Sequence, residues 1–144
     1  MHTAIDTSGF LGDRATDRLL DVVDLVLLDV KSGDPQTYRL VTSADLEPTL
    51  RFARRLSDRG TAMWIRFVLV PGLTDAWENV DAVAAFTATL SGVERVEVLP
   101  FHQLGAGKWA ELGLPYQLAG LAPPSPGLVR RVEDQFRSHG LTVC

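Results

Sequence analysis

The chain has 144 residues, of which 46% are hydrophobic and 22% charged, a composition typical of a soluble globular protein, so we treat residues 1–144 as a single domain. Its formal net charge of −4 gives no basic field for nucleic acid. No apolar run reaches membrane-spanning length and no signal-peptide pattern is present, so we expect neither nucleic acid nor a membrane as a partner, and a cytoplasmic location. The single cysteine, Cys144, excludes an internal disulfide and a cysteine-based structural metal site.

Strand and helix patterns alternate along the chain. Apolar runs predict four strands, over residues 3–5, 25–30, 62–70 and 93–99. Capping residues predict helices after Asp13, Asp34-Pro35, Asp75 and Ser125-Pro126, with Glu78 completing a capping box after Asp75. A further helix over 46–56 ends at Gly60, one helical turn is expected around 108–112, and residues 141–143 are a candidate last strand.

Successive strands joined by helices imply an α/β fold with a parallel sheet, either open and doubly wound or part of a barrel. The glycine-rich phosphate loops of nucleotide-binding folds are absent, which favours the barrel. A complete barrel of eight units typically needs about 250 residues. Because the first strand begins almost at Met1, we expect this chain to be the later portion of something larger.

Polar side chains stand at the carboxyl ends of the predicted strands. Asp29 and Lys31 close one strand and share a face of it, since side chains two residues apart point the same way. Asp6 and His102 follow two other strands, and Arg66 lies within a fourth. In barrels of strand-helix units the chemistry is assembled at these ends, so the pattern predicts a polar ligand there.

Structural roles are open for the same residues. The spacing of Asp29 and Lys31 also permits a simple ion pair. Arg66 and Glu97 face each other on neighbouring predicted strands, so mutual neutralisation inside the barrel and ligand contact are both open. For Trp109 we expect packing alone.

Four stretches of the chain resemble the pyruvate formate-lyase activating enzymes, a family of the radical S-adenosylmethionine superfamily. They are Asp6-Thr7-Ser8-Gly9, residues 25–31, residues 64–72, and residues 99–105 with Lys108-Trp109. The last is the most specific, and its continuation through Gly113, Tyr116, Leu118, Gly120 and Pro123-Pro124 resembles the pyruvate formate-lyase branch of the activators. The resemblance implies a six-stranded partial barrel of which this chain holds strands three to six.

The resemblance also implies a set of site residues. Contacts to S-adenosylmethionine are implied for Asp29, Val30, Lys31, Arg66, Val68, Leu99 and His102. A monovalent-cation site is implied for Asp6, Thr7, the carbonyl of Leu27 and Asp29.

Two hallmarks of the family are missing from the sequence. Family members hold a [4Fe-4S] cluster through a CxxxCxxC motif and the methionine amine through a GGEP-like motif, and this chain has neither. The family role is to generate a deoxyadenosyl radical that takes a hydrogen from a glycine of its target, most closely pyruvate formate-lyase, with flavodoxin or ferredoxin as electron donor. Without three thiolates we expect these 144 residues to be inactive alone.

Two other classes of function are open. One is a non-catalytic half-barrel that associates with itself or binds small anions through Lys31, Arg66 and His102. The other is an aldolase-like barrel with Lys31 as Schiff-base nucleophile.

Overall fold

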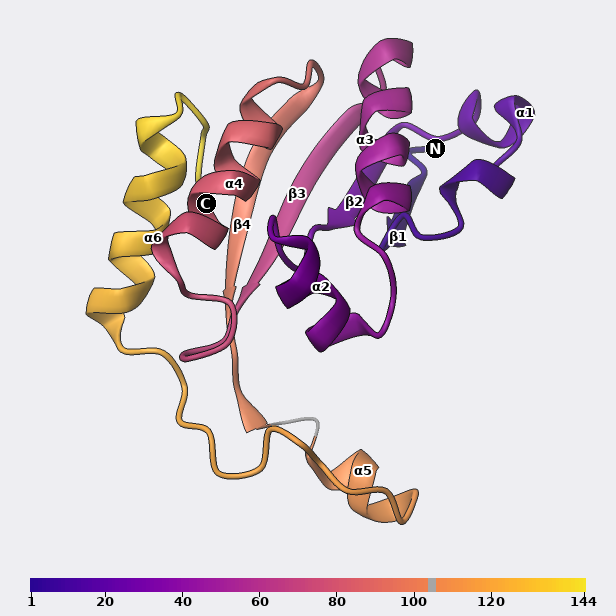
Figure 1. Ribbon diagram of the computed structural model, residues 1–144. Helices are drawn as coiled ribbons and strands as arrows, with labels where there is room; N and C mark the ends of the chain where they lie inside the picture. Colours follow the sequence, from indigo (N-terminus) through magenta and orange to yellow (C-terminus); the bar gives the residue numbers. More distant parts are fainter. Residues whose placement is uncertain (104–105) are drawn as a thin grey trace.

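The computed structural model describes residues 1–103 and 106–144, in which strands and helices alternate (Figure 1). The strands are β1 (Ala4–Thr7), β2 (Leu25–Asp29), β3 (Ala62–Leu69) and β4 (Val93–Pro100). The helices are the 3₁₀ helix η1 (Gly12–Arg14) and the α-helices α1 (Asp17–Leu20), α2 (Pro35–Thr42), α3 (Glu47–Arg59), α4 (Trp77–Ala88), α5 (Ala106–Glu111) and α6 (Pro126–Ser138). No helix of this described part is long and apolar enough to cross a bilayer.

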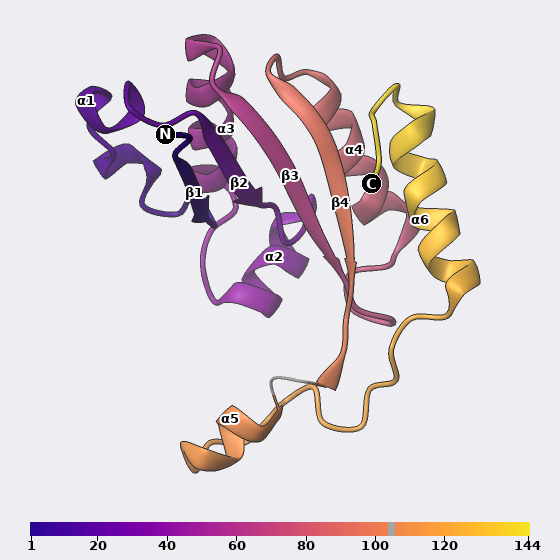
Figure 2. The same cartoon turned by 180° about the vertical axis from the view of Figure 1, so that it is seen from behind.

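The four strands form one parallel sheet in the order β1-β2-β3-β4. Each strand therefore pairs with the next one in the chain, and right-handed crossovers then place the connecting helices on the same side. Figure 1 shows α3 and α4 in front of the sheet with α6 beside α4, and in the view from behind in Figure 2 the sheet lies in front of α3 and α4. This one-sided arrangement is that of a barrel segment rather than a doubly wound sheet, so the predicted fold class is confirmed.

The core lies between the sheet and these helices. Alternate residues of β3, from Met63 to Leu69, are completely buried on the helix side, as are Val26 and Leu28 of β2. Phe67 meets Phe136 of α6 with ring centroids 5.8 Å apart. The other face of β3, which includes Trp64 and Arg66, is only partly covered.

Helix-capping signals were accurate where a proline or glycine accompanied them. Asp34 and Ser125 cap α2 and α6, and Gly60 ends α3 with a positive φ of 71°. The cap expected at Asp13 is wrong, because α1 starts later and Thr16 accepts from the Leu19 N–H instead.

The capping box expected from Asp75 and Glu78 is also wrong. Asp75 accepts a hydrogen bond from the backbone N–H of Gly72, 2.7 Å away, and so closes the turn before α4 rather than capping that helix. The candidate last strand is a single parallel bridge between Val143 and Val96.

Candidate functional site

The site is a chain of ion pairs across the carboxyl ends of three neighbouring strands. Arg66 of β3 donates from Nε to Asp29 Oδ1 of β2 at 2.7 Å, and from Nη2 to Asp6 of β1. Lys31, just beyond β2, donates from Nζ to the other oxygen of Asp29, Oδ2, at 2.8 Å. Asp29 thus receives two cations, and Arg66 joins two carboxylates.

Sheet register explains why these side chains meet. Asp29 lies opposite Arg66 in the β2–β3 pairing, and Asp6 lies opposite Leu27, two residues before that row. Residues opposite each other on neighbouring strands, and residues two apart on one strand, point to the same face of the sheet. Asp6, Asp29 and Arg66 therefore share one face, which is the face away from the helices.

Burial differs along this chain of charges. The side chains of Arg66 and Asp29 are each 18% exposed, whereas those of Lys31 and Asp6 are 34% and 59% exposed. Burial by itself lowers the pKa of Arg66, but the hydrogen bonds to Asp29 and Asp6 outweigh it and raise the pKa above its usual value. Arg66 is therefore a fixed positive charge, and Lys31 is the cation that reaches solvent.

The pairing of Arg66 with Glu97, one of the two alternatives left open, does not occur. Arg66 and Glu97 are opposite each other in the register, but Glu97 accepts from Arg95 at 2.7 Å. Arg95 also lies over the ring of Trp64, with its guanidinium carbon 3.3 Å from the ring centroid. Glu97 therefore pairs with a cation of its own strand, and Arg66 pairs with Asp29 and Asp6 instead.

The remaining predicted ligand residues surround this cluster unequally. Val30 is completely buried, and its N–H donates to the Arg66 carbonyl at 3.0 Å. Val68 is partly buried and Leu99 is 36% exposed on the outer part of the sheet. His102 follows β4 and is exposed, with no hydrogen bond to it among the described residues. Leu104 and Gly105 of the most specific motif lie outside the described residues.

The residues expected to hold a monovalent cation are only partly brought together. Asp6 and Asp29 both bond to Arg66, so its guanidinium already lies between their carboxylates. Thr7 Oγ1 instead accepts from the backbone N–H of Gly9 at 3.0 Å, within its own turn. Among the described residues no group of three or more histidine, cysteine, aspartate or glutamate side chains is arranged to hold a metal ion.

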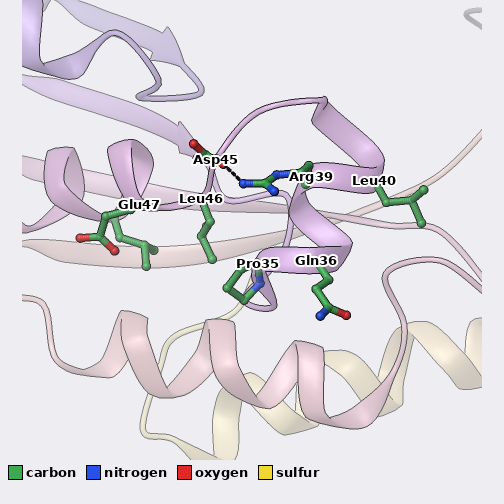
Figure 3. Close-up of a pocket in the computed structure, with 9 residues that line it drawn as sticks. Pro35, Gln36, Arg39, Leu40, Asp45, Leu46 and Glu47 are labelled. Carbon is green, nitrogen blue, oxygen red and sulfur yellow. Dashed lines mark hydrogen bonds and ion pairs between the residues drawn. The ribbon is translucent and has the colours of Figure 1, made fainter.

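The described part of the chain has two grooves near the site. One, of about 780 Å³, lies between α2 and the start of α3, and the ion pair of Arg39 and Asp45 is part of its lining (Figure 3). The other, of about 670 Å³, is lined by Lys31 and Val68 on one side and by Trp109 and Tyr116 on the other. Only the second reaches the strand ends and therefore adjoins the ion pairs.

Trp109 packs on Tyr116, with ring centroids 6.0 Å apart, and is still 43% exposed. In Figures 1 and 2, α5 extends away from the sheet beyond β4. Trp109 therefore packs on Tyr116 and also lines the groove, so the expectation of packing alone is incomplete.

A buried polar network around Asn79 and Thr74 was not predicted from the sequence. Asn79 of α4 bonds to the loop after Lys31, and Thr74 bonds to the end of β3. A weak signal was available, because Asn79 immediately precedes Val80 on the buried side of a predicted helix, where an amide needs partners.

The sequence is similar to activating enzymes over nearly its whole length. A pyruvate formate-lyase-activating enzyme of Streptococcus mutans is 44% identical over 92% of this chain and 53% of its own length. Those of Staphylococcus epidermidis and Escherichia coli K12, the second named pyruvate formate-lyase 1-activating enzyme, are 43% and 36% identical over 97% and 99% of this chain. The chain spans 58% and 59% of their lengths. No family model matches the chain.

Solved structures share the fold. A domain of a pyruvate-formate lyase-activating enzyme from Bacteroides vulgatus superimposes with a TM-score of 0.78 at 22% identity, over 100% of this chain and 80% of that one. A radical SAM methyltransferase from Sphaerobacter thermophilus gives 0.70 at 18% identity, over 98% of this chain and 39% of that one. The chain therefore shares the fold of these two structures, and by sequence it is similar to pyruvate formate-lyase-activating enzymes, of which it spans rather more than half the length.

Proposed function

We propose that this chain is the S-adenosylmethionine-binding later portion of a glycyl-radical activase, with pyruvate formate-lyase as the target. The observation that carries the proposal is the chain of ion pairs from Asp6 through Arg66 and Asp29 to Lys31 at the carboxyl ends of the strands. It occurs in a sequence 36–44% identical to activating enzymes. Parallel barrels assemble their chemistry at this end of the sheet.

The chemistry of these side chains suits S-adenosylmethionine. Lys31 is a compact cation with three donors, of which one is used on Asp29, so it can also bind a carboxylate or ribose oxygen. Val68 and Leu99 supply partly exposed apolar surface for an aromatic base, and His102 stands near the end of β4. When bound, S-adenosylmethionine would supply the deoxyadenosyl group that removes a hydrogen atom from glycine.

Within this proposal each charged residue has its own task. Arg66 holds Asp29 in place, and Asp29 in turn orients the Lys31 ammonium toward the groove shared with Trp109 and Tyr116. Since Arg66 and Lys31 together balance the charges of Asp6 and Asp29, we propose no separate monovalent cation.

The [4Fe-4S] cluster does not fit the residues of this chain. Its one cysteine, Cys144, is exposed next to the bridge between Val143 and β4, and a cluster needs several thiolates. In our proposal the cluster and its electron donor, flavodoxin or ferredoxin, therefore act through protein outside these 144 residues, and the chain by itself binds without catalysing.

Binding of S-adenosylmethionine to the purified chain, measured by isothermal titration calorimetry, tests the proposal. We expect Lys31→Met to weaken binding about tenfold, the equivalent of about 1.4 kcal/mol. Arg54→Met is the matched control, because it removes an exposed ion pair with Glu47 on the surface of α3. We expect that variant to bind as the wild type does.

Three results would contradict the proposal: no binding by the wild type, equal binding by Lys31→Met, or equal weakening by Arg54→Met. Light scattering on the same samples measures the mass of the particle and so distinguishes a ligand-binding chain from a self-associating half-barrel. A mass that doubles with concentration, without ligand binding, would favour the self-associating half-barrel.

A further inference from the structure

The ladder between β2 and β3 ends within the proposed site, at the pair of Asp29 and Arg66. The N–H of Val30 donates to the carbonyl of Arg66, and beyond that row the two chains separate into the β2–α2 and β3–α4 loops. Lys31 is the second residue of one loop, and Val68 lies two residues before the other. Beyond the ion pair of Lys31 with Asp29, contacts outside the sheet therefore help to fix these two residues relative to each other.

Asn79 of α4 supplies that link. Its Oδ1 accepts from Ser32 Oγ at 2.6 Å, from the Gly33 N–H at 2.9 Å and from the Asp34 N–H at 3.1 Å. Its Nδ2 donates to the carbonyl of Thr74 at 2.8 Å. Among the hydrogen bonds of the described residues, those of Asn79 are the ones that join the two loops.

Thr74 carries the link on to β3. Its Oγ1 donates to the carbonyl of Val68 and accepts from the N–H of Val70, both at 2.9 Å. A continuous path therefore runs from Ser32, next to Lys31, through Asn79 and Thr74 to Val68. Ser32, Thr74 and Asn79 are 0%, 3% and 4% exposed, so water does not compete for these bonds.

The loop that carries Gly33 is closely packed. A Cβ at Gly33 would lie 2.6 Å from the backbone nitrogen of Val83 and 2.7 Å from Cβ of Ala82, so the loop lies directly against α4. The side-chain amide of Asn79 is the one group on α4 that bonds there to both loops.

We propose that Asn79 is a positioning residue for the S-adenosylmethionine site: by binding both loops it sets where Lys31 stands relative to Val68. The inference rests on the proposed function for its ligand. It adds a residue that belongs neither to the ion pairs nor to the lining of the groove and that acts through the two loops it binds.

Two substitutions of Asn79 test its bonds to the two loops separately. Asn79→Leu has a similar volume and removes all four hydrogen bonds. Asn79→Asp keeps an acceptor for the N–H groups of Gly33 and Asp34 but sets a carboxylate oxygen against the carbonyl of Thr74. Val83→Ala is the matched control, because it weakens the buried face of the same helix without removing a bond to either loop.

The first readout is hydrogen exchange in the free chain, followed by NMR. We expect the Gly33 amide to exchange at least tenfold faster in Asn79→Leu than in Val83→Ala, after both are corrected for global stability, and to stay protected in Asn79→Asp. Equal Gly33 protection in all the variants would overturn the inference.

The second readout is the dissociation constant for S-adenosylmethionine. We expect it to rise about tenfold in Asn79→Leu, less in Asn79→Asp, and by less than twofold in Val83→Ala. An unchanged dissociation constant in Asn79→Leu, with the wild type binding, would also overturn the inference. If the wild type binds nothing, the proposed function fails, and the Gly33 exchange alone decides whether Asn79 fixes the loop.

Discussion

Replacing Arg66 by methionine removes the guanidinium that joins three strands but keeps an unbranched apolar side chain in its place. The variant loses the hydrogen bond of 2.7 Å to Asp29 and the bond to Asp6. Asp29 retains Lys31 as a partner. The substitution therefore measures what the ion pairs contribute to the free energy of unfolding, with most of the packing preserved.

The burial of the partners sets the magnitude. A hydrogen bond to a charged group contributes about 1.5–3 kcal/mol, and the low end applies because both side chains keep 18% exposure and Asp29 keeps a second cation. The bond to Asp6, which is 59% exposed, adds only about 0.5 kcal/mol. The expected loss is about 2 kcal/mol, which for a chain of this size lowers Tm by about 4–8 °C.

Urea unfolding at pH 7, followed by circular dichroism, gives the free energies for Arg66→Met, Asp29→Asn, Asp6→Asn and the double variant of Arg66 and Asp29. The structure requires Asp29→Asn to cost more than Asp6→Asn, and the double variant to cost less than the sum of its two single changes. A loss below about 0.5 kcal/mol in Arg66→Met, or equal costs at the two aspartates, would refute the reasoning.

Three more predictions concern the framework. Ser125→Ala removes the cap of α6 and should cost about 1 kcal/mol in urea unfolding, whereas Ser125→Asp should cost less; equal costs would count against the cap. The hydrogen bond from the Thr37 N–H holds the pKa of Asp34 below its usual 3.8. The stability that the Asp34 carboxylate adds is therefore complete above pH 3.8 and is lost as the pH falls through the lowered pKa. Asp34→Asn should lose less stability than the wild type between pH 5 and 2, and equal losses would contradict this. Gly33→Ala should cost about 1–3 kcal/mol because of the contact with α4. Gly107→Ala, whose Cβ meets nothing within 4 Å, should change stability by less than about 0.5 kcal/mol, and similar costs at the two glycines would argue against the contact.

The fold was largely predictable because its signals are local and agree with one another. Each buried strand is an apolar run with breaks around it, and the caps at Asp34 and Ser125 are each followed by a proline that cannot continue a strand ladder. The choice between a barrel segment and a doubly wound sheet depended on which strands pair. That choice needed the observed strand order.

The strand pattern placed Asp6, Asp29, Lys31 and Arg66 on one sheet, and the spacing of Asp29 and Lys31 permitted the ion pair that the structure shows. The bonds of Arg66 to Asp29 and Asp6 were not predicted. Glu97, which lies opposite Arg66, pairs with Arg95 instead, and no local pattern in the sequence indicates that exchange. The four bonds of Asn79 depend on how two loops meet a helix, which no local pattern encodes.

Strand order that follows chain order also bears on how the molecule folds. The hydrogen bonds that link neighbouring units join residues 21, 37 and 30 positions apart, at Thr3–Asp24, Asp29–Arg66 and Trp64–Glu94. Each strand can therefore dock on its predecessor soon after it leaves the ribosome, and loop closure stays inexpensive at every step. The bond between Asp6 and Arg66 spans 60 positions and forms only once three strands are aligned, so it reports on the assembly of β1, β2 and β3.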